Sequence, residues 1–137
     1  MRQDGQFKNT KQPDPDPLPA GDALVSRARL IQRWRHGSDP FFWRMEADGL
    51  LLPVRRGRRA LYRVADVFVF EGDLPPDGRE VAYRVDLMLP EEVGTLISRS
   101  RNWVLDRARS GELPCRRVGA QVRFVPAEVA RWMETWA

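Results

Sequence analysis

The sequence predicts an α+β, mainly helical fold built from two tandem copies of one small unit. Gly49 and Gly57 recur as Gly111 and Gly119, in both cases 62 positions later. Further identical residues coincide at the same spacing without gaps. They are Ser38 and Ser100, Leu51 and Leu113, Arg55 and Arg117, Ala65 and Ala127, and Val67 and Val129. A copy of about 50 residues buries little surface and is marginally stable alone, so we expect the two copies to pack together.

Polar segments rich in proline separate the predicted units. Residues 1–22 include Asp14-Pro15-Asp16-Pro17, whose alternating prolines disfavour helix and sheet, and they are predicted to be a flexible arm. Residues 73–80 contain Pro75-Pro76 and Asp77-Gly78, which are typical of turns, and they are predicted to be a hinge. The first unit is therefore placed at residues 23–72 and the second at residues 81–137.

The first unit is predicted to contain three helices and a hairpin. The first helix has an apolar stripe at helical spacing, and the second, residues 39–48, is capped by Ser38 or Asp39. Two short strands, residues 50–54 and 60–64, flank a turn at Gly57, and a closing helix covers residues 66–70. The stripe of the first helix consists of Leu24, Ala28, Ile31 and Trp34.

The second unit repeats this order after a short strand predicted at residues 81–85, where apolar and polar residues alternate. A helix opens at Pro90-Glu91-Glu92, and a second helix, capped by Ser98 or Ser100, buries Val104 and Ala108. Strands at residues 113–118 and 121–125 flank Gly119. The last helix opens at Pro126, and one side of it carries Val129, Trp132, Met133 and Trp136.

Helix, turn, helix, hairpin and helix is the order of a winged helix-turn-helix unit. The second unit resembles the excisionase and MerR-like (AlpA-type) winged helix-turn-helix family over residues 89–132. The resemblance rests on Leu89 to Val93, Ser98 to Arg101, Ser110 to Pro114, Arg117 to Gly119, Val122 to Phe124, Pro126 to Val129 and Trp132. It implies DNA binding, with the second helix in the major groove and the hairpin, or wing, on the backbone or minor groove. Phe41 and Trp103 depart from the family pattern, which usually has a small polar residue there.

Charge also points to a polyanionic partner. The formal net charge is +4, and all but two of the 23 basic residues are arginine. Residues 23–72 hold ten arginines and five acids, and residues 87–137 hold eight arginines and six acids, so the excess lies on the two units. The planar guanidinium suits phosphates and guanine edges, although a GC-rich genome, whose codons favour arginine, explains the same bias.

Arginines and one asparagine are the candidate DNA contacts. On the second helix of the second unit, burial of Val104 and Ala108 turns Arg101, Asn102 and Arg109 to solvent, for contact with base edges or as a solvated face. The first wing carries the denser arginine cluster and is predicted to bind DNA more strongly than the second, the alternative being a merely soluble hairpin. The full predicted set is Arg44, Arg55, Arg56, Arg58, Arg59, Arg99, Arg101, Asn102, Arg109, Arg116, Arg117 and Arg123.

Little in the sequence suggests catalysis or a ligand. Cys115 and His36 are the only residues of their kinds, which leaves no disulfide, no cysteine-based metal site and no convincing catalytic pair. We predict no enzyme activity, cofactor, metal or small-molecule ligand. No apolar run approaches the roughly 18 residues of a membrane span, and no signal-peptide pattern is present, so a cytoplasmic, nucleoid-associated protein is expected.

The sequence therefore predicts a sequence-specific, double-stranded-DNA-binding protein. By resemblance it is a transcriptional regulator or an excisionase-type architectural factor of a mobile element or phage, with tandem units that contact half-sites about 34 Å apart. The alternative is a protein-interaction module, in which Phe41, Trp43 and Phe68 of the first unit contact a recombinase, polymerase or other regulator. Phe41 and the equivalent Trp103 either widen the local core or pack the units against each other or a second copy, with base stacking as a third reading.

Overall fold

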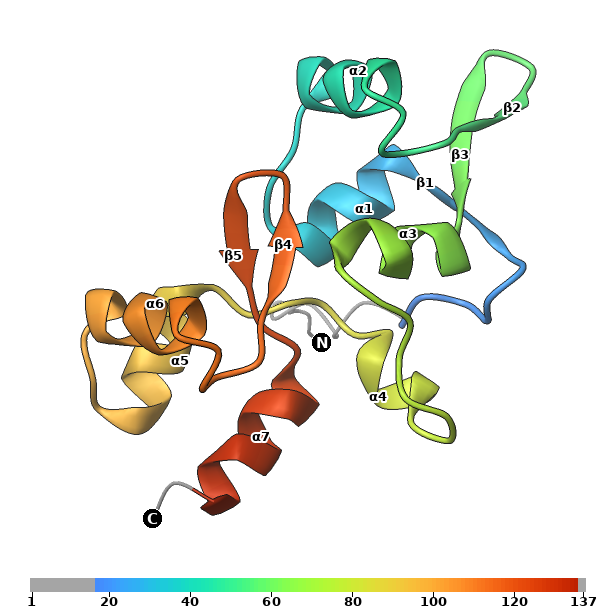
Figure 1. The fold of residues 1–137 in the computed structure, drawn as a ribbon. Helices are drawn as coiled ribbons and strands as arrows, with labels where there is room; N and C mark the ends of the chain where they lie inside the picture. Colours follow the sequence, from blue (N-terminus) through green and yellow to red (C-terminus); the bar gives the residue numbers. More distant parts are fainter. Residues whose placement is uncertain (1–16, 136–137) are drawn as a thin grey trace, which may run out of the picture.

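The computed structural model describes residues 17–135, which form an α+β chain with seven helices and two small sheets (Figure 1). The first half forms one three-stranded antiparallel sheet, in the order β1-β3-β2, and three helices. Its elements are β1 (Leu24–Ser26), α1 (Arg27–Trp34), α2 (Asp39–Ala47), β2 (Val54–Arg56), β3 (Arg59–Arg63) and α3 (Val64–Glu71).

The second half is reached through a linker that contains the single-turn helix α4 (Glu80–Tyr83). It has one two-stranded sheet and three helices, and an isolated bridge joins Met88 to Phe124. Its elements are α5 (Pro90–Ile97), α6 (Arg101–Arg109), β4 (Arg116–Val118), β5 (Gln121–Arg123) and α7 (Pro126–Thr135).

The same order of elements occurs in both halves. α6 begins and ends 62 positions after α2, and β4 begins and ends 62 positions after β2. Gly57 and Gly119 occupy the two hairpin turns with φ values of 62° and 61°, a conformation in which a side chain is strained. The bridge between Met88 and Phe124 takes the place of the pairing of Val25 with Tyr62, with Phe124 62 positions and Met88 63 positions later, and α5 likewise lies 63 positions after α1. The sequence repeat is therefore matched by a repeat of local structure.

Serine caps explain where the second helix of each half begins. The Ser38 Oγ accepts a hydrogen bond from the Phe41 N–H at 3.4 Å, and the Ser100 Oγ accepts one from the Trp103 N–H at 3.1 Å. Of the caps predicted as alternatives, Asp39 and Ser98 are therefore not used. Ser98 instead ends α5 in a left-handed conformation, with φ 60°.

The two halves share a hydrophobic core, as their small size predicts. One cluster is centred on Trp34, Phe42 and Tyr62 of the first half and includes Val118 and Val125 of the second. The other cluster lies inside the second half, around Val104, Phe124 and Trp132. Figure 1 places the β4–β5 hairpin between α1 and α2 on one side and α5 and α6 on the other.

Several predicted boundaries are wrong. Residues 81–85 form part of α4 and a loop rather than a strand; Val81 is exposed, and Tyr83 is buried. The strand predicted at 50–54 lies instead at 54–56, and the one predicted at 113–118 shortens to 116–118, because Leu51 and Leu113 fill the core from loops. Leu24 belongs to β1 instead of the first helix.

The last residues of the predicted flexible arm contact the rest of the protein. Leu18 is 1% exposed, and its N–H donates a hydrogen bond to the Arg84 carbonyl oxygen at 2.9 Å. Leu18 therefore packs on the linker, and the Gly21 carbonyl oxygen accepts a hydrogen bond from the Ala65 N–H of α3 at 3.1 Å. The rest of the predicted arm, residues 1–16, lies outside the described residues, as does Trp136 of the last helix.

Candidate nucleic-acid interface

The β2–β3 hairpin projects from the edge of the molecule and carries the densest group of exposed arginines (Figure 1). Arg56 pairs with Arg59 across the hairpin, and Arg58 lies in the turn beside Gly57. Within residues 17–135 the hairpin has one ion pair, in which Arg55 Nη2 lies 3.7 Å from Glu46 Oε1. The guanidinium groups of Arg56, Arg58 and Arg59 are therefore available to a polyanion. The exposure predicted for all four arginines, Arg55, Arg56, Arg58 and Arg59, is confirmed.

The base of this hairpin is held to the helices by a hydrogen-bonded triad. Glu46 of α2 accepts a hydrogen bond from Arg27 Nη2 at 2.9 Å and another from the Tyr62 hydroxyl, and Arg27 Nε donates to the Tyr62 oxygen at 2.9 Å. Burial and the hydrogen bond to Glu46 raise the pKa of Tyr62 to about 12. Burial opposes ionisation of Glu46, but the bonds from Tyr62 and Arg27 outweigh it and lower the pKa of Glu46. The arginine hairpin is thus fixed at its base and free at its tip.

α6 is the second candidate surface. Val104 and Ala108 are buried, and Arg101, Asn102 and Arg109 are exposed, so the predicted orientation is confirmed. Acidic groups lie beside two of these residues: Arg101 Nε is 3.5 Å from Glu91, and Arg109 Nη1 is 2.6 Å from Asp106. The outward face of α6 therefore carries less free positive charge than the β2–β3 hairpin. Exposed pairs of this kind are weak and can exchange for phosphate.

A tight turn sets the position of α6 on α5. A Cβ atom at Gly94 would lie 2.5 Å from the Arg99 carbonyl oxygen, closer than real side chains approach a backbone. Only glycine therefore lets the Ser98–Ser100 turn approach α5 this closely. Arg99, predicted as a DNA contact, is exposed, with its guanidinium over the Trp103 ring at 5.1 Å. Arg44, another predicted contact, is exposed on α2.

The second hairpin is not a free wing, because two of the predicted DNA contacts, Arg116 and Arg123, lie on the face that packs against the rest of the protein. Both side chains are buried, each 6% exposed. Arg123 donates hydrogen bonds to the carbonyl oxygens of Trp34 and Arg35 at 2.8 and 3.2 Å, where α1 ends. Arg116 donates to the Asp73 carbonyl oxygen at 2.6 Å, and its guanidinium covers the Tyr83 ring at 5.4 Å. Arg117 follows Arg116 in β4 and lies on the opposite face of the strand, where it is exposed as predicted.

A sequence signal for this burial exists. Residues two apart in a strand share a face, so Arg116 lies on the same face of β4 as Val118, which is fully buried. Arg123 is the cross-strand partner of Arg116 and lies on that face too. The apolar Val118 marks the face that packs against the first half.

Phe41 seals the contact between the halves. A Cβ atom at Gly119 would lie 2.9 Å from Phe41 Cε1, so the tip of the second hairpin touches this ring directly. Phe41 also packs on Trp34 and Phe70, and its ring edge meets His36 with centroids 5.0 Å apart. Burial, together with the charges of Arg123 and Arg44, lowers the pKa of His36. Phe41 therefore widens the core and joins the halves at once.

Trp103, at the equivalent position of the second half, packs against residues of its own half. It is half-buried and packs on Trp132 with ring centroids 6.3 Å apart, and the Arg107 guanidinium lies over its ring at 5.2 Å. The reading in which this residue widens the core of its own half is the one that these contacts support.

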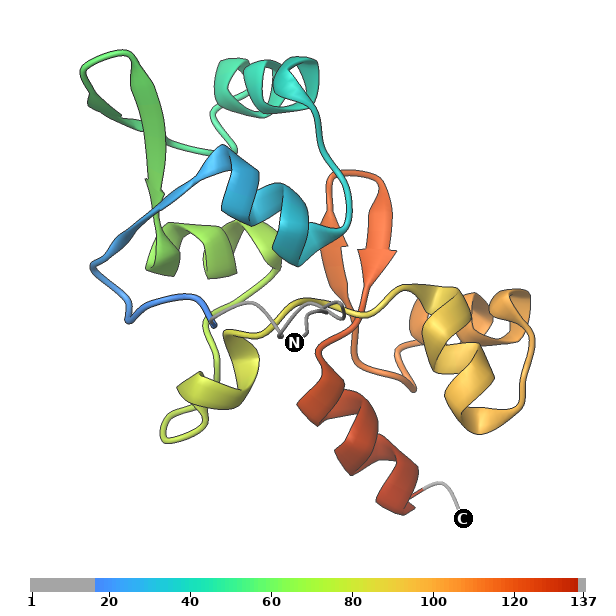
Figure 2. The ribbon, with the colours of Figure 1, turned by 180° about the vertical axis from the view of Figure 1, so that it is seen from behind.

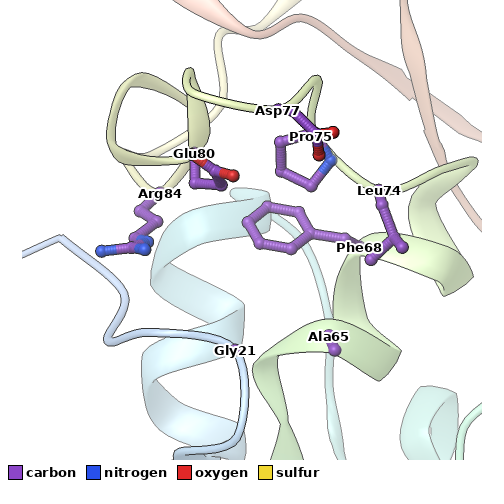
Figure 3. Close-up of a pocket in the computed structure, with 8 residues that line it drawn as sticks. All are labelled: Gly21, Ala65, Phe68, Leu74, Pro75, Asp77, Glu80 and Arg84. Atoms are coloured by element: carbon purple, nitrogen blue, oxygen red, sulfur yellow. The ribbon is translucent and has the colours of Figure 1, made fainter.

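The hollows on the surface lie away from the arginine hairpin. A pocket of about 170 Å³ is enclosed by Phe68 of α3, the loop from Leu74 to Asp77, and Glu80 and Arg84 of the linker (Figure 3). A groove of about 320 Å³ runs between Met45 and Leu50 near the end of α2, Val69 and Phe70 of α3, and Arg117. Neither is lined by the four hairpin arginines or by α6.

The described part of the chain shows neither a metal-binding cluster nor a membrane-spanning helix. Among residues 17–135, no three His, Cys, Asp or Glu side chains cluster as ligands for a metal ion. None of the helices in that range has the length and apolar character needed to cross a membrane.

Comparisons of the chain with protein-family models, curated proteins and solved structures gave no match. What the chain does is therefore inferred from the chemistry of its exposed side chains. The chain offers a projecting arginine hairpin and a polar outward helix face on one connected body.

Proposed function

We propose that this protein binds double-stranded DNA without catalysis, and that the β2–β3 hairpin makes its principal contact with the phosphate backbone. The observation that carries this proposal is the group of four exposed arginines, with one weak ion pair among them, on a hairpin that stands clear of the body. Arginine pairs with phosphate through a rigid fork of donors, and the release of counterions from DNA then drives binding.

α6 supplies base contacts in this proposal. Asn102 is the residue type that pairs with adenine, and Arg101 and Arg109 are suited to guanine. Contacts of these types give sequence preference, whereas phosphate contacts give affinity and orientation.

The repeated order of elements supports the interpretation of each half as a diverged winged helix-turn-helix unit of the excisionase and MerR-like kind. On that resemblance the protein acts as a transcriptional regulator or as an architectural factor of a mobile element or phage. This part of the proposal rests on analogy of fold, which does not determine function by itself.

A protein-binding role for the first half has less support than the sequence suggested. Phe41 and Phe68, two of the three aromatic residues predicted to contact a partner, are each only 4% exposed. Trp43 remains, 57% exposed, with Leu50 and Leu52 also exposed near the end of α2. These residues favour protein binding as the second candidate function.

Fluorescence anisotropy with a labelled duplex at about 50 mM salt tests the DNA-binding proposal. The hairpin variant Arg58→Ala/Arg59→Ala is compared with Arg79→Ala/Arg131→Ala, which removes the same charge from exposed positions elsewhere. We expect the hairpin variant to lose affinity about tenfold or more and the control variant much less. Equal losses of affinity in the two variants would show that net charge alone is responsible. If the unmodified protein does not bind the duplex, protein binding remains as the candidate function.

A further inference from the structure

The outward faces of α2 and α6 differ in chemistry, although the two helices occupy equivalent places in the repeat. The face of α6 is polar and hydrogen-bonding, whereas that of α2 is acidic at its first residue and otherwise apolar except for Arg44. The equivalent pairs are Asp39 and Arg101, Pro40 and Asn102, Trp43 and Leu105, Arg44 and Asp106, and Ala47 and Arg109. In α2, neither Pro40 nor Ala47 has a side chain able to donate to a base edge. The first turn of α2, the part of a recognition helix that contacts base edges, therefore lacks the donors that Arg101 and Asn102 provide in α6, and the exposed charged donor of α2 is Arg44 on its second turn.

The two hairpins differ in the opposite sense. Arg56, Arg58 and Arg59 of the first hairpin correspond to Val118, Ala120 and Gln121 of the second. The second hairpin is also covered, because Phe41 lies against Gly119 and because Arg123 is bonded to the end of α1. In each half, therefore, only one of the two elements compared has groups suited to DNA. It is the hairpin in the first half and the helix in the second.

The halves are fixed in position relative to each other. The Leu87 N–H donates a hydrogen bond to the Arg33 carbonyl oxygen at 2.8 Å, and Arg35 Nη1 lies 2.8 Å from Glu92 Oε1 at the start of α5. Together with Arg123 these contacts tie the end of α1 to the linker, to α5 and to β5. Figures 1 and 2, seen from opposite sides, both place α6 and the β2–β3 hairpin at opposite ends of this body.

We propose, building on the DNA-binding function above, that the protein recognises one asymmetric duplex site with its halves in different roles. α6 contacts base edges, the β2–β3 hairpin holds phosphates that flank them, and α2 contacts no bases. The target is then a single contiguous motif with a sequence-neutral flank. This replaces the expectation of two equivalent half-sites about 34 Å apart, which requires both helices to contact bases.

Selection of binding sites from a randomised duplex pool tests this proposal, with a matched pair of helix variants. Asn102→Ala changes α6 and Trp43→Ala changes α2, and both residues are exposed, so neither change removes a core contact. We expect the unmodified protein to select one motif, and both Trp43→Ala and Arg44→Ala to select the same motif. Asn102→Ala should lose preference at one or more motif positions by about tenfold, while its salt-sensitive binding to unrelated duplex persists.

The outcomes separate this inference from the function on which it rests. Two copies of a motif, a motif altered by Trp43→Ala or Arg44→Ala, or binding without any motif would each overturn the division of roles and leave DNA binding intact. The absence of binding to any duplex in the pool would overturn both. Arg58→Ala/Arg59→Ala should select the unchanged motif with weaker affinity, and a changed motif in that variant would also contradict the proposal.

Discussion

The guanidinium of Arg123, in β5, donates a hydrogen bond to the main-chain carbonyl oxygen of Trp34, the last residue of α1, at 2.8 Å. A second bond, to the Arg35 carbonyl oxygen, satisfies another acceptor at the same helix end. A charged donor aimed at the negative end of a helix is favourable. In the second half of this chain, a hairpin arginine therefore connects the halves instead of contacting a ligand.

Replacing Arg123 with methionine should destabilise the protein by about 2 to 3 kcal/mol, because one buried and one partly buried carbonyl oxygen lose a charged donor. Arg117→Met is the matched control, because Arg117 lies in β4 of the same hairpin and its side chain is exposed. This change should lower the free energy of unfolding by less than about 0.5 kcal/mol. Urea unfolding of both variants measures the difference. Similar free energies of unfolding for the two variants would refute the connecting role of Arg123.

Gly119→Ala and Gly57→Ala form a second matched pair, since both glycines have φ near 60° in equivalent turns. Each alanine should cost about 1 to 2 kcal/mol of backbone strain. At Gly57 a Cβ atom meets nothing within 4 Å, whereas at Gly119 it lies 2.9 Å from Phe41 Cε1. Gly119→Ala should therefore be the more destabilising by about 1 to 3 kcal/mol.

Replacing the Phe41 ring with a smaller aliphatic side chain should relieve the collision with the Cβ atom that Gly119→Ala adds. We expect Phe41→Leu to cost less stability in the Gly119→Ala background than in the unmodified protein, as measured by thermal or urea unfolding. Additive effects of the two changes would mean that the hairpin tip does not press on Phe41.

The buried ion pair between Arg33 and Glu71 should be costly to break from one side only. Both side chains are fully buried, two Arg33 nitrogens lie 2.8 Å from the carboxylate, and Trp34 Nε1 donates to the same group. Arg33→Met leaves a buried charge without its partner and should cost about 3 to 5 kcal/mol. Arg33→Met/Glu71→Gln removes that charge and keeps an acceptor for Trp34, so it should be the more stable variant. If the double variant is less stable than Arg33→Met, this explanation is wrong.

Stability should fall as the pH rises from 10 to 12. The chain has two tyrosines, Tyr62 and Tyr83. Burial raises the pKa of each to about 12, and a hydrogen bond to a carboxylate is the second cause. The folded state then holds a proton that the unfolded state releases near pH 10, so the stabilisation is complete below pH 10 and is lost on the way to 12. Phenolate absorbance should show a midpoint near 12 in the native protein and near 10 after denaturation; a native midpoint near 10 would contradict these contacts.

The sequence predicts elements well where local chemistry determines them. Serine caps at Ser38 and Ser100 and turns at Gly57 and Gly119 lie where the pattern places them. The predicted strand at 81–85 fails for a tertiary reason: Arg33 Nη1 donates hydrogen bonds to the carbonyl oxygens of Tyr83 and Val85, so these acceptors bond a side chain from α1 instead of a strand. The alternation of apolar residues there resembles a strand but does not produce one.

In the candidate site, too, the sequence predicts what local chemistry determines and misses what distant contacts determine. Exposure of Arg58, Arg59 and Asn102 follows from turn position and helix periodicity, so the sequence predicts it. Burial of Arg123 depends on carbonyl oxygens nearly ninety positions earlier in the chain, which periodicity cannot identify. The face shared by Arg116 and Val118 is the one local clue to it.

The most direct test of DNA binding by the β2–β3 hairpin is the salt dependence of affinity for a duplex. Neutralisation of about four phosphates by its arginines predicts that log K falls against log salt with a slope of about −4. Removing Arg58 and Arg59 should reduce the slope to about −2. An affinity that does not change with salt, or a slope that is the same in the double variant, would contradict the proposed role of the hairpin.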